Sequence, residues 1–343
     1  MTRLTTLVAL LLAMSAIASG VEAQAPPPTG TIAGTIRNGT AGASTPTLTV
    51  QLIAIPRSGP VTSQQVVTAG GRFRFEASAD ANLTYLLRTE YAGVPYLDDA
   101  PVLISPELPT VQREITVWET TAERPALRID TTTVTIEGIE RDRGALTVQR
   151  EDQVLNPSDR VYIGGQDRIT YRAPAPTNTL AVQAAETFDG KTAVEGQTIT
   201  STRPMRPGVT SIVTTAVVGY DRAAGSYRLR VTAPLPTALT EVWVPERFAR
   251  NLRTESGARR ESRERGGERS HIARATVAVR EGESLLMTLE DLSGMNPANQ
   301  LTSERGAAIA AGLALAVLAG GVTLLVRART RVDTEATTDE SAS

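Results

Sequence analysis

Two adjacent carboxylates, Asp98 and Asp99, follow two tyrosines, Tyr91 and Tyr96, in the segment YAGVPYLDD. Aromatic rings and acidic oxygens on one loop are groups that could contact a sugar or a cation, so these four residues form the candidate ligand-binding site. A calcium ion needs several convergent oxygens, and two neighbouring acids do not define such a site by themselves. A solvated turn is therefore the alternative interpretation of the same residues.

Few other residues could carry chemistry. His271 is the single histidine and Lys191 the single lysine, and the chain has no cysteine. One histidine cannot form a histidine-pair metal site or an H-E-x-x-H motif, and we expect His271 at an exposed strand end. Lys191 follows Asp189-Gly190 in a turn-like segment, where an amine is not desolvated enough to become a nucleophile. We therefore predict no catalytic residue, no metal site, no cofactor and a chain that is not an enzyme.

Strand-like segments must position these residues. Residues 48–55 (LTVQLIAI) and 72–76 (RFRFE) show alternation of apolar and polar side chains, and residues 83–90 look like a further strand, with turn signals between the segments. Short strands at a spacing of roughly 8–12 residues are typical of β-sandwiches. The sequence therefore predicts an all-β fold of tandem β-sandwich domains, transthyretin-like or immunoglobulin-like. The expected boundaries are 30–109, 110–203 and 204–303.

Three further features modify this outline. Trp118 and Trp243 lie in alternating segments, so we expect both in sandwich cores rather than on a sugar-binding surface. Residues 247–269 mix arginine, glutamate and glycine, with only Phe248 and Leu252 as bulky apolar residues. Such a segment is poor at burying a core, so we predict a long mobile hairpin loop. Binding of this loop to anionic lipid or to a partner is the alternative.

Hydrophobic segments flank the β region. Residues 1–23 resemble a secretory signal peptide, because their apolar run is too short to span a membrane and ends in small residues. An uncleaved anchor is the alternative, and residues 24–29 are expected to be a proline-rich linker. Residues 306–326 are apolar and precede three arginines within residues 327–331, which predicts a transmembrane helix with a cytoplasmic tail at 327–343. The prediction is a single-pass type I membrane protein with exoplasmic or periplasmic β domains.

The overall charge narrows the list of partners. The chain has 35 Lys and Arg residues against 37 Asp and Glu residues, for a formal net charge of −2. This balance leaves no basic footprint for nucleic acid. The absence of cysteine excludes disulfide bonds.

Two sets of segments resemble bacterial sequences. Residues 30–36 (GTIAGTI), 48–55, 70–75 (GGRFRF) and 83–87 (LTYLL) resemble a carboxypeptidase regulatory-like domain, a transthyretin-like sandwich of the carbohydrate-binding-like superfamily. Residues 91–96, 117–121 (VWETT), 156–162 (NPSDRVY) and 206–208 (RPG) are similar to exported proteins that join such a domain to further sandwiches and a membrane helix. The resemblance implies this architecture and a non-catalytic module, because the catalytic domain of those peptidases is a separate one.

These observations lead to one expected function and two alternatives. We expect a non-catalytic, membrane-tethered scaffold or accessory protein that contacts a protein partner in the envelope. A surface module that binds a glycan or a peptide is the first alternative. A hydrolase, which would need carboxylates converging within about 5–10 Å, is the second.

Overall fold

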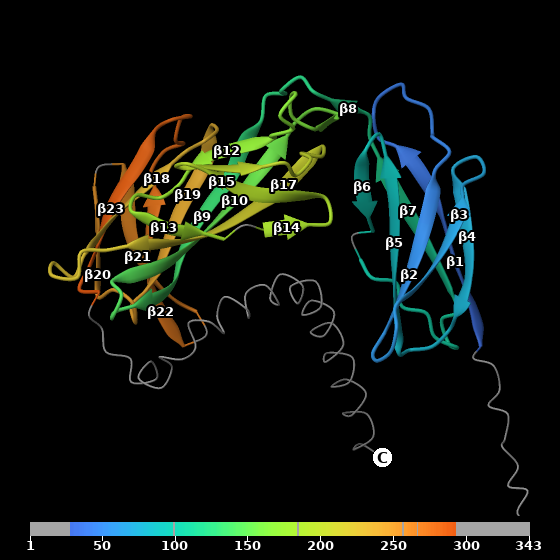
Figure 1. Cartoon of the computed structure of the whole chain (residues 1–343), viewed down its shortest axis with the longest axis horizontal. Coiled ribbons are helices and arrows are strands. Elements are labelled where there is room, and N and C mark those ends of the chain that lie inside the picture. The colour runs from blue at the N-terminus through green and yellow to red at the C-terminus, as the bar shows by residue number, and fades with distance from the viewer. Residues whose placement is uncertain (1–27, 99, 184, 256, 266, 293–343) are drawn as a thin grey trace, which may run out of the picture.

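The computed structural model describes residues 28–292, except residues 99, 184, 256 and 266. The described residues are all-β, and their strands form two units (Figure 1). The predicted signal peptide (1–23), transmembrane helix (306–326) and tail (327–343) lie outside the described residues, as does most of the 24–29 linker. Within residues 28–292, no helix has the length and apolar character needed to cross a membrane.

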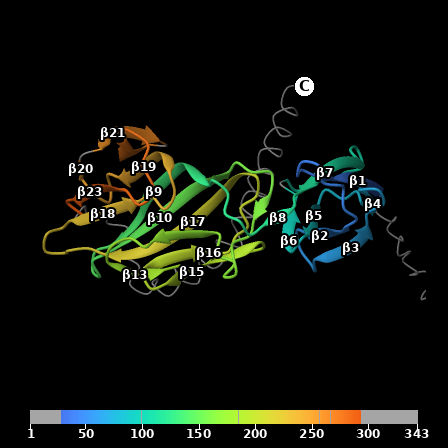
Figure 2. The ribbon, with the colours of Figure 1, turned by 90° about the horizontal axis from the view of Figure 1, so that it is seen from above.

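The first unit is a sandwich of two sheets (Figure 2). One sheet has the order β4 (Arg72–Ser78), β1 (Thr29–Asn38) and β7 (Thr110–Val117), and the other has the order β3 (Thr62–Val67), β2 (Thr49–Pro56), β5 (Leu83–Tyr91) and β6 (Val94–Leu97). Alternate residues of these strands point inward, so that Ile32, Leu52, Phe73 and Leu87 are all buried in one core.

This unit extends beyond the boundary at residue 109 expected from the sequence. Strand β7 pairs in parallel with β1, and Thr110 lies opposite Thr31. Its inward residues Ile115 and Val117 pack in the core of the first unit. Residues 110–117 therefore complete the first sandwich instead of beginning a second one.

The second unit is built on one seven-stranded sheet. Its order is β13 (Thr179–Val182), β17 (Gly208–Gly219), β10 (Ala145–Asn156), β9 (Arg128–Glu140), β19 (Thr237–Pro245), β22 (Glu268–Ala275) and β21 (Ala258–Arg265). Two smaller sheets cover it, and we call them the four-stranded lid and the three-stranded lid. The four-stranded lid contains β12 (Tyr171–Pro174), β16 (Thr198–Ser201), β15 (Gly190–Glu195) and β14 (Ala185–Thr187), and the three-stranded lid contains β18 (Tyr227–Thr232), β23 (Ser284–Glu290) and β20 (Asn251–Thr254).

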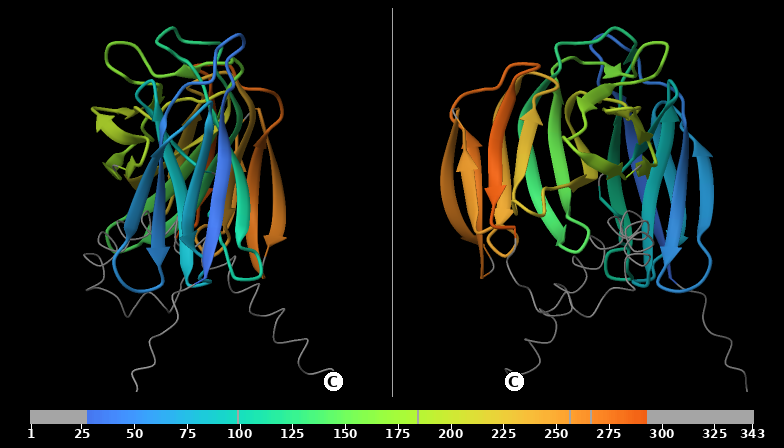
Figure 3. Two further views of the ribbon diagram at one scale, coloured as in Figure 1. Left: turned by 90° about the vertical axis from the view of Figure 1, so that its right-hand side faces the viewer. Right: turned by 60° about the vertical axis from the view of Figure 1, so that its left-hand side comes forward.

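Both lids pack on the same face of this sheet. Along β10, Val148 lies in a core with residues of the three-stranded lid, whereas Val154 lies in a second core with Tyr171 and Ala173 of the four-stranded lid. Positions 148 and 154 share one face because side chains alternate along a strand. The long strands β9, β10 and β17 run under both lids (Figure 3). The sheet thus contains strands from both sides of the expected boundary at residues 203–204.

The segment predicted as a mobile loop, 247–269, is ordered into strands, so that prediction is wrong. Strands β21 and β22 form a hairpin in which Glu264 lies opposite Arg269. Opposite charges across a strand pair stabilise it, so the mixture of arginine and glutamate favours pairing here. Phe248 and Leu252 are buried in the core under the three-stranded lid.

Candidate functional site

The structure places the two candidate tyrosines at the contact between the two units. Tyr96 is 4% exposed, and its ring centre lies 6.0 Å from that of Trp118. The backbone amide of Trp118 donates a hydrogen bond to the Tyr96 hydroxyl at 3.2 Å. Tyr91 is half-buried and its hydroxyl donates to the Glu119 carboxylate. Tyr96 therefore packs against Trp118, and Tyr91 hydrogen-bonds to Glu119.

Of the two candidate acids, the structure describes Asp98. Asp98 forms a salt bridge with Arg113 of β7, with 3.1 Å between the carboxylate and Nε. Asp99 lies outside the described residues. The structure thus brings Tyr91 and Tyr96 together beside Trp118 and pairs Asp98 with an arginine.

The loop after β1 makes the first set of contacts between the units. The Thr40 hydroxyl donates to the Asp159 carbonyl at 2.8 Å, and the Ala41 amide donates to the Asp159 carboxylate at 2.9 Å. The Asn38 side-chain amide donates to Glu119 at 3.0 Å. Glu119 lies just before β8 (Thr120–Thr121), which pairs with β11 (Val161–Tyr162) of the second unit.

Arg206 makes the second set of contacts. Its guanidinium donates to the Asp189 carboxylate at 2.7 Å and to the Pro95 carbonyl of β6 at 2.6 Å. The same group lies 5.2 Å from the Tyr96 ring centre, within the range of a cation–π interaction. Asp189 is 0% exposed at its side chain and also binds Arg203. One arginine thereby links a buried carboxylate of the second unit to the backbone and an aromatic ring of the first.

The charge state of this contact follows from its surroundings. Burial raises the pKa of Asp189, but the hydrogen bond from Arg206 and the charges of Arg203 and Arg206 outweigh it and hold that pKa below its usual value. The hydrogen bond from Tyr91, followed by that from Asn38, lowers the pKa of Glu119. Both carboxylates are therefore ionised at neutral pH. We refer to Asn38, Thr40, Tyr91, Tyr96, Trp118, Glu119, Asp159, Asp189 and Arg206 as the joint.

Sequence reasoning missed the role of Arg206 and Asp189. Both lie in segments with turn signals, RPG at 206–208 and DGK at 189–191. Nothing in those signals shows that the two turns meet. The only available signal was general: arginine side chains stack on aromatic rings, and Tyr96 was already a candidate residue.

A buried belt of polar residues divides the two cores of the second unit. Asp152 and Tyr171 are 1% and 3% exposed, and Tyr171 and Thr132 both donate hydrogen bonds to Asp152. Arg150 pairs with Asp152 at 2.7 Å and donates to the Thr232 carbonyl at 2.9 Å. Burial raises the pKa of Tyr171, so its hydroxyl stays protonated and donates. The buried belt (Thr132, Arg150, Asp152, Tyr171) connects the sheet with both lids.

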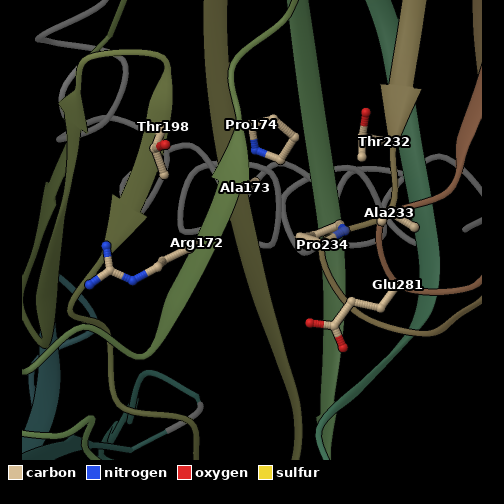
Figure 4. A pocket seen from close by; sticks show the side chains of 9 residues that line it. Arg172, Ala173, Pro174, Thr198, Thr232, Ala233, Pro234 and Glu281 are labelled. Carbon is tan, nitrogen blue, oxygen red and sulfur yellow. The ribbon is translucent and has the colours of Figure 1, made fainter.

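A shallow groove lies between the two lids (Figure 4). One cavity of about 320 Å³ adjoins another of about 310 Å³, and the two share Arg172, Pro234 and Glu281. Arg172 and Glu281 stand on opposite sides of the first cavity. Ala173 and Ala233, both buried, also line this cavity.

Three further expectations concern Trp118, Trp243 and His271. Trp118 is half-buried at the joint, whereas Trp243 is half-buried on the sheet face opposite the lids, where Arg263 lies 5.6 Å from its ring centre. Neither tryptophan is fully within a core as expected. The prediction of an exposed His271 is wrong, because this residue is 5% exposed and its Nε2 lies 3.0 Å from the Arg250 carbonyl. Glu246 and Arg250, in the segment that follows β19, lie against this side chain and account for its burial.

No group of three or more metal-ligating side chains is present in the described part of the chain. No family model matches this chain, and no curated protein matches it. The resemblance to carboxypeptidase regulatory-like domains therefore has no support from these comparisons.

Solved structures give only weak likenesses. An M1 zinc metallopeptidase from Deinococcus radiodurans is 14% identical at a TM-score of 0.29, over 48% of this chain and 42% of that one. The major pilin SpaA of Corynebacterium diphtheriae is 14% identical at a TM-score of 0.20, over 59% of this chain and 61% of that one. This chain spans less than half the length of the metallopeptidases it matches.

One prediction is corrected by these comparisons. The expectation that the chain is not an enzyme is contradicted, because several of the structural neighbours are zinc metallopeptidases. That expectation is withdrawn. At a TM-score of 0.29, the likeness transfers no reaction and no catalytic residue to this chain.

Proposed function

We propose that this chain is a membrane-tethered scaffold or accessory protein that holds two β units in a fixed relation for contacts with an envelope protein. The joint is the observation that carries this proposal. Hydrogen bonds from Thr40 and Ala41 to Asp159, together with the contacts of Arg206, tie the units at two separate places. A joint of this kind favours a defined spacing between two binding surfaces over free movement on a linker.

The sequence supports the location in this proposal. The apolar segment 306–326 with its following arginines is the proposed anchor, and residues 1–23 are the proposed export signal. The same proposal includes the first sandwich, which we propose to be a carboxypeptidase regulatory-like domain because residues 30–87 resemble one.

Quantitative affinity capture tests this function. The tagged full-length chain is crosslinked in its native membranes, solubilised and analysed by mass spectrometry. We expect a partner at near-stoichiometric level with the wild type and a reduced level with the double variant Arg206→Ala, Asp159→Ala, which removes side-chain contacts from both sets that join the units. The variant Lys191→Ala changes an exposed residue near Asp189 and serves as the matched control. Recovery of the chain alone would contradict the proposal.

The groove supports a second candidate, a surface module that binds a peptide or a glycan. Arg172 and Glu281 carry opposite charges on two sides of the groove, which suits a short extended ligand with polar groups at both ends. Arg124 lies 3.6 Å from Glu281 and extends the polar rim. Binding of a peptide or glycan library by the wild type, lost in the variant Arg172→Ala, Glu281→Ala, would support this candidate. Equal binding by the two proteins would exclude the groove.

A further inference from the structure

The edge strands of this protein differ in how they discourage pairing with other chains. Natural sheets protect their edges with charged residues, proline or short length. Strand β21 reads ARRESRER, and β4 and β7 also carry arginine and glutamate. Strand β3 reads TSQQVV, with no charged residue and no proline. Among the described strands, the other uncharged edges have four residues or fewer: β6, β8, β11 and β13.

The backbone of β3 presents hydrogen-bonding groups to its free side. The Thr68 amide donates to the Leu48 carbonyl at 2.8 Å, in line with the β2–β3 register. Because ladder hydrogen bonds alternate along an antiparallel pair, the even-numbered residues of β3 bond to β2. The amides and carbonyls of Ser63, Gln65 and Val67 therefore point away from β2.

The side chains around this edge are exposed. Every residue of β3 except the half-buried Val66 is exposed to solvent. Val61 and Val67 are 59% and 63% exposed, and they lie three residues before and three residues after Gln64. Figures 1 and 2 both place β3 on the side of the first unit away from the second unit.

We propose that β3 pairs antiparallel with β3 of a second copy of this chain, about a two-fold axis at Gln64. This register sets Ser63 of one copy opposite Gln65 of the other, so that outward-pointing backbone groups meet. It also sets each exposed Val61 opposite a Val67. Like charges opposite one another would destabilise such a pair, and this register places none there. The symmetry of the exposed valines about Gln64 favours a second copy over an unrelated strand, since an isologous contact must be self-complementary.

The paired strands join two four-stranded sheets into one continuous sheet. The contact uses only the first unit, so it leaves the joint and the groove free. This inference does not rest on the proposed scaffold function, and each can fail without the other.

Disulfide crosslinking tests the register directly, because the chain has no cysteine of its own. Gln64 would form a non-hydrogen-bonded pair with its own copy, with a Cα separation of about 4.5 Å, which a disulfide can bridge. We expect the full-length variant Gln64→Cys to form dimers under mild oxidation, about tenfold faster than Ser262→Cys on the charged edge β21. Equal rates for the two variants would overturn the proposal.

A charge at the axis provides the second test. In Gln64→Lys two like charges would face each other, and we expect the dimer dissociation constant to rise about fivefold or more in sedimentation analysis. Gln64→Thr is uncharged and favours strands, so it should stay dimeric. Unchanged melting curves would confirm that both variants fold. A monomeric wild type, or a Gln64→Lys variant as dimeric as the wild type, would overturn the proposal.

Discussion

Two arginine–aspartate pairs of similar geometry hold different parts of this molecule. Arg150–Asp152 and Arg206–Asp189 both have an N–O distance of 2.7 Å, and both carboxylates are almost fully buried. The first pair lies within one strand, β10, and its partners Thr132, Tyr171 and Thr232 all belong to the second unit. The second pair reaches the Pro95 carbonyl and the Tyr96 ring of the other unit.

The first pair should therefore affect the folding stability of the second unit, and the second pair should affect the position of the two units relative to each other. The buried belt lies between the two hydrophobic cores of the second unit. Removing one of its two charges leaves the other unpaired and buried beside both cores, which destabilises the whole unit. The joint lies between two units that each have a core of their own. Arg206 and Asp159 of the joint belong to neither core, so loss of their contacts should free the units to move while both stay folded.

The largest effect is expected at the buried belt. Asp152→Ala leaves the Arg150 guanidinium without its carboxylate in a buried position, which costs about 3–5 kcal/mol in the free energy of unfolding. Denaturant unfolding of the full chain measures the loss. Gln153→Ala, at the exposed neighbouring position, should change the stability by less than about 0.5 kcal/mol. Equal stabilities of Asp152→Ala and Gln153→Ala would show that the Arg150–Asp152 pair does not stabilise the second unit.

A smaller effect on stability, with a larger effect on arrangement, is expected at the joint. In Arg206→Ala, Asp189 keeps Arg203 as a partner, so we expect a loss of about 1–3 kcal/mol. The contacts to Pro95 and Tyr96 disappear. Small-angle scattering should then show a broader distribution of overall dimensions than in the wild type. An unchanged scattering profile would show that the loop contacts at Asp159 suffice to hold the units.

Acid should weaken the joint by the smallest amount. Glu119 and Asp189 both have lowered pKa values in the folded protein. Such groups contribute stability above their unfolded pKa values of about 4, and that contribution is lost as the pH falls through the folded pKa values. We expect the scattering profile to stay constant from pH 7 to about 5 and to broaden below about 4. Glu119→Gln should reduce this dependence, and a wild type that loosens above pH 6 would contradict the assignment.

The sequence predicted the strand class and many strand positions because alternation of side chains is a local property. The segment RFRFE became β4, with Phe73 and Phe75 in the core. The pairing of distant strands was not accessible in this way. That β7 pairs with β1, or that β17 and β19 share a sheet with β9 and β10, depends on contacts between residues far apart in the chain.

The candidate site shows the same limit. Tyr91 and Tyr96 were predicted to belong to a ligand-binding site, and the structure shows their contacts with Glu119 and Arg206. A tyrosine at the end of a strand has the same local sequence pattern whether it contacts another part of the protein or a ligand. The charged segment 247–269 was misread for a related reason, since its composition resembles disorder until its cross-strand partners are known.

One measurement tests the central claim, that the joint holds the two units in a fixed relation. The full-length chain is spin-labelled at Gln112→Cys on β7 and Ser262→Cys on β21, both exposed positions in a chain without native cysteine. It is diluted with unlabelled chain, so that only distances within one molecule are recorded by pulsed electron paramagnetic resonance. We predict a single narrow distance distribution for the wild type and a broad one for Arg206→Ala with Asp159→Ala. A broad distribution in the wild type would contradict the account.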